Sequence, residues 1–371
     1  MPDRLIVNPG VDRVHAYPQA LKAILSLARA EDAAAVIRSW QGYAPTPLRD
    51  LAPLARACGV AGLAYKDEGS RFGLGSFKSL GGAYAVERVV ARRGRDGLTV
   101  TSATDGNHGR AVAWGAARAG VKAVIYIHEH VSEGRAEAIR RLGATVVREG
   151  ANYDASVRAA AEAAARNGWQ VISDTSWPGY VDVPRDIMQG YVLLALEAEA
   201  QAPPPTHIFI QGGVGGIAAA ILSHAWERYG PARPGIIVVE PENAACLFES
   251  AAASRRVSVG GALDTIIAGL ACGEPSVLAW DILGAGADAF MTVSDDGARD
   301  AMRRLAALGV VGGESGVAGL AGLISVAGQP AFRDLIGLDA SSRVLCYGTE
   351  GATDPVVYAG IVGRTPEEVG A

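Results

Sequence analysis

The sequence predicts an α/β protein built on mostly parallel sheets that are flanked by helices. Short runs rich in β-branched residues alternate with longer stretches rich in alanine and leucine. The runs are TVTSA, AVIYI, TVVR, QVISD, HIFIQ, IIVVE and RVLCY, which begin at residues 99, 123, 145, 170, 207, 236 and 343. Strands that alternate with helices of this length pair in parallel through helical crossovers.

The length of the chain and the order of its elements predict two domains. With 371 residues the chain is too long for one ordinary domain. Several compact strand–helix units follow one another between residues 99 and 185, and we expect them to form a small domain. Residues 1–98 and 186–371 then form a large domain.

The composition argues against several classes of protein. Hydrophobic residues make up 49% of the chain, enough for a sizeable core, and the formal net charge is −5. Because the basic residues are scattered, we expect no nucleic-acid partner. The N-terminus does not read as a signal peptide, and no apolar run approaches the roughly 18–20 residues that a membrane helix needs. We therefore expect a cytoplasmic protein with no membrane partner.

The cysteines indicate neither a metal site nor a disulfide framework. Cys58, Cys246, Cys272 and Cys346 lie far apart and lack the spacing of zinc ligands. We expect buried structural thiols and no bound metal. A redox pair between Cys246 and Cys272 stays open, because both are expected in loops.

A glycine-rich turn follows one of the predicted strands. HIFIQGGVGGIAAAILSHAWERYG, residues 207–230, reads as a strand, a turn and a helix. Its glycines let the backbone approach an anion, and the amides at the start of the helix favour a phosphate. A purely structural turn is an alternative. So is a dinucleotide site, because Gly213, Gly215 and Ala218 match G-x-G-x-x-A and Glu240 ends the next strand.

Polar residues also follow three other predicted strands. TDGNHG, residues 104–109, offers backbone amides, a hydroxyl, an amide and a carboxylate that together suit a carboxylate ligand, although Thr104 or Asp105 can also simply cap the helix. Asp174 ends another strand, where α/β proteins place ligands. Tyr347, Thr349 and Glu350 lie at the end of the last strand, within reach of a bound ring, although a surface turn explains them equally well.

One lysine lies among small residues. Lys78 stands in GSFKSLGGAYAV, residues 75–86, just where an apolar helix begins, and a lysine is costly there unless its amine has a role. A cofactor with a phosphate, an aldehyde for the lysine and a ring that needs polar partners would use Lys78 and all these turns together. Pyridoxal phosphate (PLP) fits that description.

The chain resembles the fold-type II PLP enzymes, the group of tryptophan synthase β, threonine dehydratase and serine racemase. Within that group it is most similar to the 2,3-diaminopropionate ammonia-lyases. The resemblance begins near YAPTPLRDL and continues through KDEGSRFGLGSFKSLGGAY, TDGNHGRAVAW, SDTSWPGY, IMQGY, GLACGEP, GESGVAGL and TEGATDP. It therefore covers nearly the whole chain, and it implies two open, twisted sheets with an active site between a large and a small domain.

The resemblance also implies how the cofactor is held. Lys78 would form the Schiff base and act as a base toward the α-proton, Phe77 would lie beside the ring, and Asn107 would bond the ring hydroxyl. The phosphate would be held by Gly212, Gly213, Val214, Gly215 and Gly216. Tyr347 and Thr349 are the candidates for the partner of the ring nitrogen.

For the substrate, the resemblance implies a carboxylate held by Thr104, Gly106, Asn107 and His108. Asp105, on the ring face opposite the lysine, would accept a proton from a D-configured substrate or hold a second amine. Asp174 would bind the amine of the substrate side chain. The chain also departs from the diaminopropionate enzymes, with Gly75-Ser76 where they typically have Asn-Ala before the Phe-Lys pair.

We therefore predict a carbon–nitrogen lyase that converts 2,3-diaminopropionate to pyruvate and ammonia by PLP-dependent β-elimination. Serine, threonine and 3-hydroxyaspartate are alternative substrates, and β-replacement is an alternative reaction. An NAD-dependent oxidoreductase is the alternative from a different class. The resemblance further implies a homodimer.

Overall fold

The computed structural model describes residues 3–104, 106–151 and 153–370, and it contains two separate β-sheets. The larger sheet has seven strands in the order β1-β10-β9-β8-β11-β3-β2. Its edge strands β1 and β2 run antiparallel to their neighbours, and all its other pairings are parallel. The strands are β1 Leu5–Val7, β2 Leu48–Asp50, β3 Gly62–Asp67, β8 His207–Gln211, β9 Gly235–Pro241, β10 Ala289–Val293 and β11 Arg343–Gly348.

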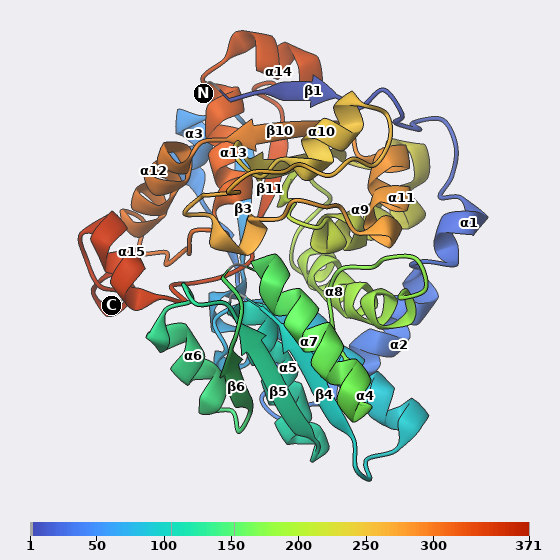
Figure 1. Ribbon diagram of the computed structural model, residues 1–371. Coiled ribbons are helices and arrows are strands. Elements are labelled where there is room, and N and C mark those ends of the chain that lie inside the picture. The colour runs from blue at the N-terminus through green and yellow to red at the C-terminus, as the bar shows by residue number, and fades with distance from the viewer. Residues whose placement is uncertain (1–2, 105, 152, 371) are drawn as a thin grey trace.

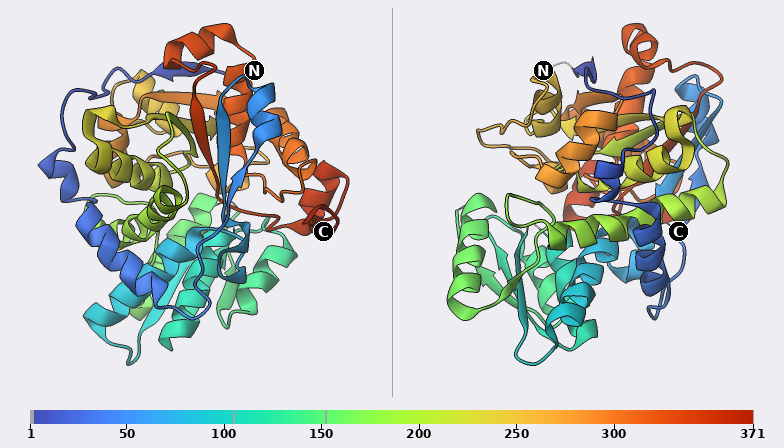
Figure 2. Two further views of the ribbon diagram at one scale, coloured as in Figure 1. Left: turned by 180° about the vertical axis from the view of Figure 1, so that it is seen from behind. Right: turned by 90° about the vertical axis from the view of Figure 1, so that its right-hand side faces the viewer.

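The smaller sheet is wholly parallel, with four strands in the order β6-β5-β4-β7. These strands are β4 Thr99–Ala103, β5 Lys122–Ile127, β6 Thr145–Arg148 and β7 Gln170–Val171. The two sheets occupy different lobes of the molecule (Figures 1 and 2). The predicted α/β class with two mostly parallel sheets is confirmed.

Helices flank both sheets. They are α1 Gln19–Lys22, α2 Leu27–Arg38, α3 Ala52–Ala57, α4 Lys78–Arg93, α5 Asn107–Ala119, α6 Glu133–Arg140, α7 Tyr153–Asn167, α8 Asp182–Gln201, α9 Gly216–Tyr229, α10 Cys246–Ala252, α11 Val277–Gly286, α12 Asp295–Ala306, α13 Ala318–Ala327, α14 Pro330–Ile336, α15 Pro355–Val362 and α16 Pro366–Gly370. Within the described residues, no helix is long and apolar enough to cross a membrane.

The strand side chains alternate between two cores, as the period of a β-strand requires. In β8, Ile208 and Ile210 belong to a core shared with α4, α5, α8 and α9, whereas Phe209 belongs to a core shared with α12 and α13. Because helices cover both faces, this central strand is buried along its whole length. The first core also contains residues of the smaller sheet, such as Val100 and Ile125, so it joins the two lobes.

The parallel strands of both sheets send the loops at their carboxyl ends to the region between the lobes. The loops after β4, β7, β8 and β11 all contribute residues to one pocket there. This placement follows the general rule that α/β proteins bind ligands at the carboxyl ends of their strands.

Candidate active site

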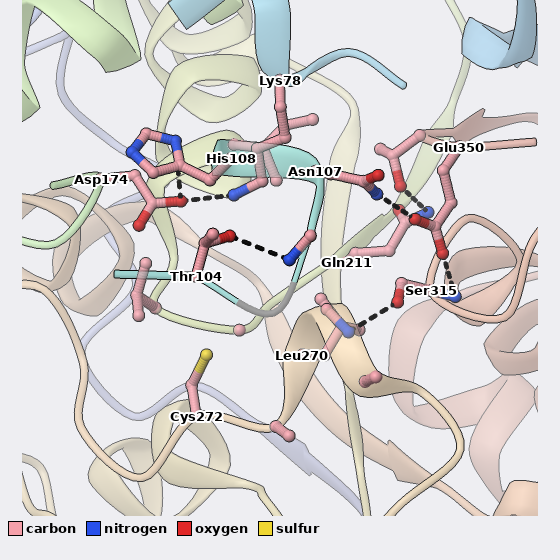
Figure 3. A pocket seen from close by; sticks show the side chains of 18 of the residues that line it. Lys78, Thr104, Asn107, His108, Asp174, Gln211, Leu270, Cys272, Ser315 and Glu350 are labelled. Atoms are coloured by element: carbon pink, nitrogen blue, oxygen red, sulfur yellow. Dashed lines mark hydrogen bonds and ion pairs between the residues drawn. The ribbon is translucent and has the colours of Figure 1, made fainter. Parts of the chain in front are cut away.

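The pocket between the lobes is lined by the first residues of α4 and by loops from both sheets. Figure 3 shows Lys78, His108 and Asp174 gathered on one side of it, and Asn107, Gln211, Ser315 and Glu350 on the other. Most of the residues singled out in the sequence therefore come together at one place.

Lys78 and Asp174 form an ion pair in this pocket. Lys78 Nζ lies 2.5 Å from Asp174 Oδ2, and only 20% and 15% of the two side chains is exposed. Burial opposes the charge on both groups, but their mutual attraction outweighs it, so the pKa of Lys78 is raised and the pKa of Asp174 is lowered. Both groups are therefore charged at neutral pH, and each stabilises the other.

The position of Lys78 is fixed by how α4 packs on α8. A Cβ added to Gly190 would lie 2.1 Å from the carbonyl oxygen of Leu80, and one added to Gly81 would lie 2.5 Å from the Tyr191 ring. The two helices therefore meet backbone to backbone, which only glycine permits. The contact brings the Tyr191 ring within 4.6 Å of the Phe77 ring, directly beside Lys78.

The turn before Lys78 is held against the loop that follows β11. Gly351 N donates to Gly75 O at 2.9 Å, and Phe77 N donates to Thr349 O at 3.0 Å. Gly75 has a φ of +77°, a left-handed conformation that glycine and asparagine tolerate best. Gly75, where the resemblance implies an Asn, therefore has a backbone conformation that both residues tolerate.

The loop after β4 combines helix capping with contacts in the pocket. Thr104 Oγ1 accepts hydrogen bonds from Gly106 N at 3.0 Å and Gly109 N at 3.2 Å, so Thr104 caps α5 while it also lines the pocket. Asn107 Nδ2 donates to Glu350 Oε2. Asp105 lies outside the residues that the structure describes.

His108 is a buried neutral imidazole next to Asp174. Burial lowers the pKa of His108, although the nearby Asp174 carboxylate opposes this shift. Its Nε2 lies 2.9 Å from Ile172 O, which can only accept, so Nε2 carries the proton. Nδ1 is then an acceptor 3.8 Å from Asp174 Oδ2, and no hydrogen bond reaches it from the described part of the chain.

The glycine turn presents backbone amides to the pocket. Gly212, Gly213, Val214 and Gly216 line it together with Ile217, whereas Gly215 N donates to Gly212 O behind the turn. Among the described residues, no acceptor is bonded to the amides of Gly213, Val214, Gly216 or Ile217. Four amides at the start of the 14-residue helix α9 are thus available for an anion.

The side of the pocket on which Figure 3 shows Gln211, Ser315 and Glu350 is polar, and of these three residues the sequence places only Glu350 within reach of a bound ring. Gln211 Nε2 donates to Thr349 Oγ1 at 3.1 Å and to the carbonyl oxygens of Gly316 and Tyr347. Glu350 accepts from Ser315 N at 2.8 Å as well as from Asn107. Burial, with a further contribution from the Glu350 carboxylate, raises the pKa of Glu314 to about 7.

These residues come from β8, the loop before α13 and the loop after β11. The motifs GESG and TEGATD, which both belong to the resemblance, could have indicated most of these residues. Each motif taken alone, however, is equally typical of a surface turn. Tyr347 is not brought into the pocket. Its ring belongs to the core beneath the sheet, and only its backbone contacts the Gln211 side chain.

Two further expectations concern Glu240 and the cysteines. Glu240 is fully buried and accepts from Leu247 N at 3.0 Å and Phe248 N at 2.7 Å, so it caps α10 and does not line the pocket. This use of Glu240 disfavours a dinucleotide site. All four cysteines are thiols in the structure, and Cys246 is the first residue of α10 and not part of a loop.

The pocket fits PLP by its own chemistry. Its amides suit a phosphate, Lys78 supplies the amine that an aldehyde requires, and Phe77 and Tyr191 provide an apolar wall for a ring. Asn107 and Thr349 offer polar partners near the same position.

Known proteins agree with this chemistry. The profile of the family described as "Pyridoxal-phosphate dependent enzyme" matches residues 39–344. Diaminopropionate ammonia-lyase from Salmonella typhimurium is 40% identical over 357 residues, which cover 86% of this chain and 88% of that protein.

Solved structures are similar over nearly the whole chain. The Escherichia coli diaminopropionate ammonia lyase, in complex with an aminoacrylate-PLP azomethine reaction intermediate, matches with a TM-score of 0.89 and 36% identity, covering 97% of this chain and 96% of that one. Threonine deaminase isoform 2 from Solanum lycopersicum, at 22% identity and a TM-score of 0.81, shares the fold. The chain therefore belongs to the pyridoxal-phosphate dependent enzyme family and, within it, to the diaminopropionate ammonia-lyases, and its cofactor is pyridoxal phosphate.

Proposed function

We propose that this enzyme removes ammonia from 2,3-diaminopropionate by β-elimination. With one water consumed, the products are pyruvate and two molecules of ammonia. The observation that carries the proposal is the partly buried ion pair between Lys78 and Asp174, which lies in the same pocket as the free amides of the glycine turn. The names of the relatives support the same reaction.

Several residues of the pocket would hold the cofactor. The amides of Gly213, Val214, Gly216 and Ile217 would bind its phosphate, Phe77 would flank the ring, and Asn107 and Thr349 would bond its polar atoms. Of the two candidates for the ring nitrogen, Thr349 is favoured because Tyr347 lies outside the pocket. When bound, the cofactor withdraws electrons from the α-carbon and so stabilises the negative charge that forms there.

Asp174 would recognise the second amine of the substrate. A buried carboxylate needs a cation, and in the structure Lys78 provides it. Whenever the lysine amine loses its charge, the Asp174 carboxylate requires another cation, and the side-chain ammonium of 2,3-diaminopropionate supplies one. Serine and threonine offer only a hydroxyl at this position. When either of them is bound, the negative charge of the Asp174 carboxylate would have no cation beside it.

Proton transfer would involve two groups on opposite sides of the substrate. The Lys78 amine would remove the α-proton of an L-configured substrate, and Asp105 is proposed for the D-configured one. Because Nδ1 of the neutral His108 carries no proton, this ring would not act as an acid; it would accept a hydrogen bond from a substrate ammonium and would not donate one to the substrate carboxylate. A solved structure of the E. coli relative is a complex with D-serine, which supports access for D-configured amino acids in that protein.

The test is a substrate panel with the purified holoenzyme. We expect pyruvate and ammonia from L- and D-diaminopropionate in a ratio of one to two, and much slower release of keto acid from serine, threonine and 3-hydroxyaspartate. Failure to release a keto acid from any of them would contradict the elimination. An added thiol that diverts the product into a new amino acid would instead indicate β-replacement.

We also propose the arrangement of the chain around this reaction. Residues 1–98 and 186–371 would form the large domain, residues 99–185 the small domain, and two chains a homodimer that works in the cytoplasm. Light scattering coupled to size-exclusion chromatography tests the dimer, since a mass of one chain would contradict it.

A further inference from the structure

The segment that carries Asp174 is tied to the glycine turn by two buried serines. Ser176 lies two residues after Asp174, and Ser276 lies immediately before α11. Only 3% of Ser176 and none of Ser276 is exposed. We call these two residues the serine pair. Buried hydroxyls are costly unless they are hydrogen-bonded, so their bonds indicate what they do.

The hydroxyls of the serine pair lie 2.7 Å apart. Ser276 Oγ also accepts from Ser176 N at 3.1 Å, and Ser176 Oγ also accepts from Leu278 N at 2.9 Å. Val277 N donates to Ser176 O at 3.2 Å. The pair therefore joins the loop after β7 to the first turn of α11 by four hydrogen bonds.

The same pair reaches the anion-binding turn. Ser276 N donates to Val214 O at 3.0 Å, and Val214 is one of the residues whose free amide faces the pocket. The Asp174 carbonyl oxygen also lies 3.8 Å from the position that a Cβ on Gly216 would occupy. The chain segment around Asp174 thus packs directly against the turn.

The other end of the Asp174 loop is anchored to the smaller sheet. Tyr180 OH accepts from Ser173 N at 2.9 Å and donates to Val171 O at 2.9 Å. Asp174 therefore lies between two anchors, Tyr180 toward the smaller sheet and the serine pair toward the larger one. The distance between Asp174 and Lys78 therefore depends on both of these anchors.

We propose that Ser176 and Ser276 are positioning residues that couple the phosphate-binding turn to the substrate-binding carboxylate of Asp174. Removing either hydroxyl loosens the Asp174 loop and shifts Val214, so the affinities for cofactor and for substrate fall together. The substrate part of this inference rests on the proposed function, whereas the cofactor part does not.

The experiment compares Ser176→Ala, Ser276→Ala and the double variant with the wild-type holoenzyme. Cofactor loss on dilution is followed by the visible absorption band, and kcat and KM are measured with 2,3-diaminopropionate. Each single variant is expected to raise the cofactor dissociation constant and KM by at least about fivefold, the effect of one lost buried hydrogen bond, because each hydroxyl takes part in two such bonds, and kcat is expected to change less than about threefold. The double variant is expected to show a smaller effect than the product of the two single effects, because the bond between the two hydroxyls is already lost in each single variant.

Three further variants separate coupling from loss of stability. Ser223→Ala is the matched control, because Ser223 is equally buried and, among the described residues, its hydroxyl bonds only to Ala220 O within α9. Ser223→Ala is expected to change neither the cofactor dissociation constant nor KM by more than about twofold. Tyr180→Phe, at the other anchor, is expected to raise KM without altering cofactor affinity. Ser176→Cys is expected to recover part of the cofactor affinity and part of the low KM that Ser176→Ala loses.

Two results would overturn the coupling. One is cofactor affinity and KM within about twofold of wild type in both serine variants, even if their melting temperatures fall. The other is strict additivity in the double variant. If the wild-type enzyme itself releases no keto acid, the proposed reaction fails, but the cofactor measurement still decides whether the serine pair holds the turn.

Discussion

Two lysines, Lys66 and Lys78, lie twelve residues apart in the sequence, and both pair with a carboxylate, but their surroundings differ. Lys66 is completely buried at the end of β3, and its ammonium donates to Thr46 O at 2.7 Å, Glu197 Oε2 at 2.7 Å and Gln201 Oε1 at 3.0 Å. All three of its protons are therefore used. Lys78 faces the pocket, and Asp174 is the one acceptor that the described residues bring within hydrogen-bonding distance of its amine.

The pKa values of the two lysines shift in opposite directions. Burial lowers the pKa of Lys66 despite the opposing attraction of Glu197, whereas the attraction of Asp174 more than offsets burial and raises the pKa of Lys78. Lys66 also belongs to a larger network, since Arg71 bonds both Glu197 and Glu68. Burial and pairing alone therefore do not identify a reactive lysine. The useful feature is a charged amine with unused donors beside a cavity.

The strongest test of this comparison is Lys78→Arg. Arginine keeps a positive charge for Asp174 but cannot bond covalently to an aldehyde cofactor as the lysine amine does. We expect kcat/KM to fall by at least about 10³-fold and the visible band of the cofactor to disappear, with little change in melting temperature. A variant that keeps the band would show that another amine holds the cofactor.

Lys66→Met should affect stability instead. It leaves Glu197 buried with one fewer cation, and the loss of one partner from a buried ion pair costs about 3–5 kcal/mol. Urea unfolding measures this cost, and kcat per folded molecule should stay within about threefold of wild type. Equal loss of cofactor binding in folded Lys66→Met protein would contradict the purely structural role of Lys66.

Glu314→Gln should change how stability depends on pH. The pKa of Glu314 is raised from 4.5 to about 7 in the folded protein, so the folded state binds the proton more tightly than the unfolded state. This contribution is complete below pH 4.5 and is lost as the pH rises to 7, by up to about 3 kcal/mol. The variant should therefore gain stability relative to wild type across this range.

Urea unfolding at pH 5, 6, 7 and 8 checks this difference. Glu162→Gln is the control, because the Glu162 side chain is 70% exposed. Its unfolding free energy should differ from that of wild type by the same amount at every pH. Parallel pH curves for wild type and Glu314→Gln would show that Glu314 is charged throughout.

Asp174→Asn should weaken substrate binding more than the chemical step. The amide cannot compensate the charge of an ammonium, and the loss of a charge-assisted hydrogen bond corresponds to about a 10–100-fold increase in KM for diaminopropionate. Asp182→Asn, at an aspartate whose side chain is 77% exposed, should leave KM unchanged. An equal increase in KM for serine would contradict the recognition of a second amine.

The smallest effect concerns the turn before Lys78. Gly75→Ala places a Cβ 3.3 Å from Thr353 Cγ2 at a φ of +77° and should cost about 1–2 kcal/mol of unfolding free energy. Gly75→Asn should cost less, because asparagine tolerates this conformation better. If both variants lose the same stability, the side chain and not the backbone conformation decides what fits here.

Local sequence patterns predicted most of the fold and about half of the pocket. Strands such as 207–211 and the glycine turn after them depend on neighbouring residues, and so does the placement of Lys78 at the first turn of a helix. By contrast, the bond between Asn107 and Glu350 joins residues 243 positions apart, and only the pairing of the two lobes brings them together. QVISD was predicted as one strand, but β7 ends at Val171, Ile172 packs in the core, and only Asp174 at the end of the run lines the pocket.

Tyr347 shows why it is hard to predict from sequence which residues near the end of a strand reach a pocket. It lies inside β11, where the ring packs into the core, whereas Thr349 follows the end of the strand and reaches the pocket. The exact end of β11 decides which of the two side chains can reach the pocket. The ends of helices and strands are the features that sequence patterns define least well.

The contact between Gly81 and Gly190 limits how this active site can change. Because α4 and α8 touch through their backbones at these two glycines, any side chain added there would push the helices apart and displace Phe77 and Tyr191, which line the pocket. A variant enzyme selected for bulkier amino acids can gain space without disturbing this crossing at the wall that contains Leu270 and Cys272, whose side chains can be shortened. Directed evolution of substrate range should therefore accumulate its substitutions there and leave the helix crossing untouched.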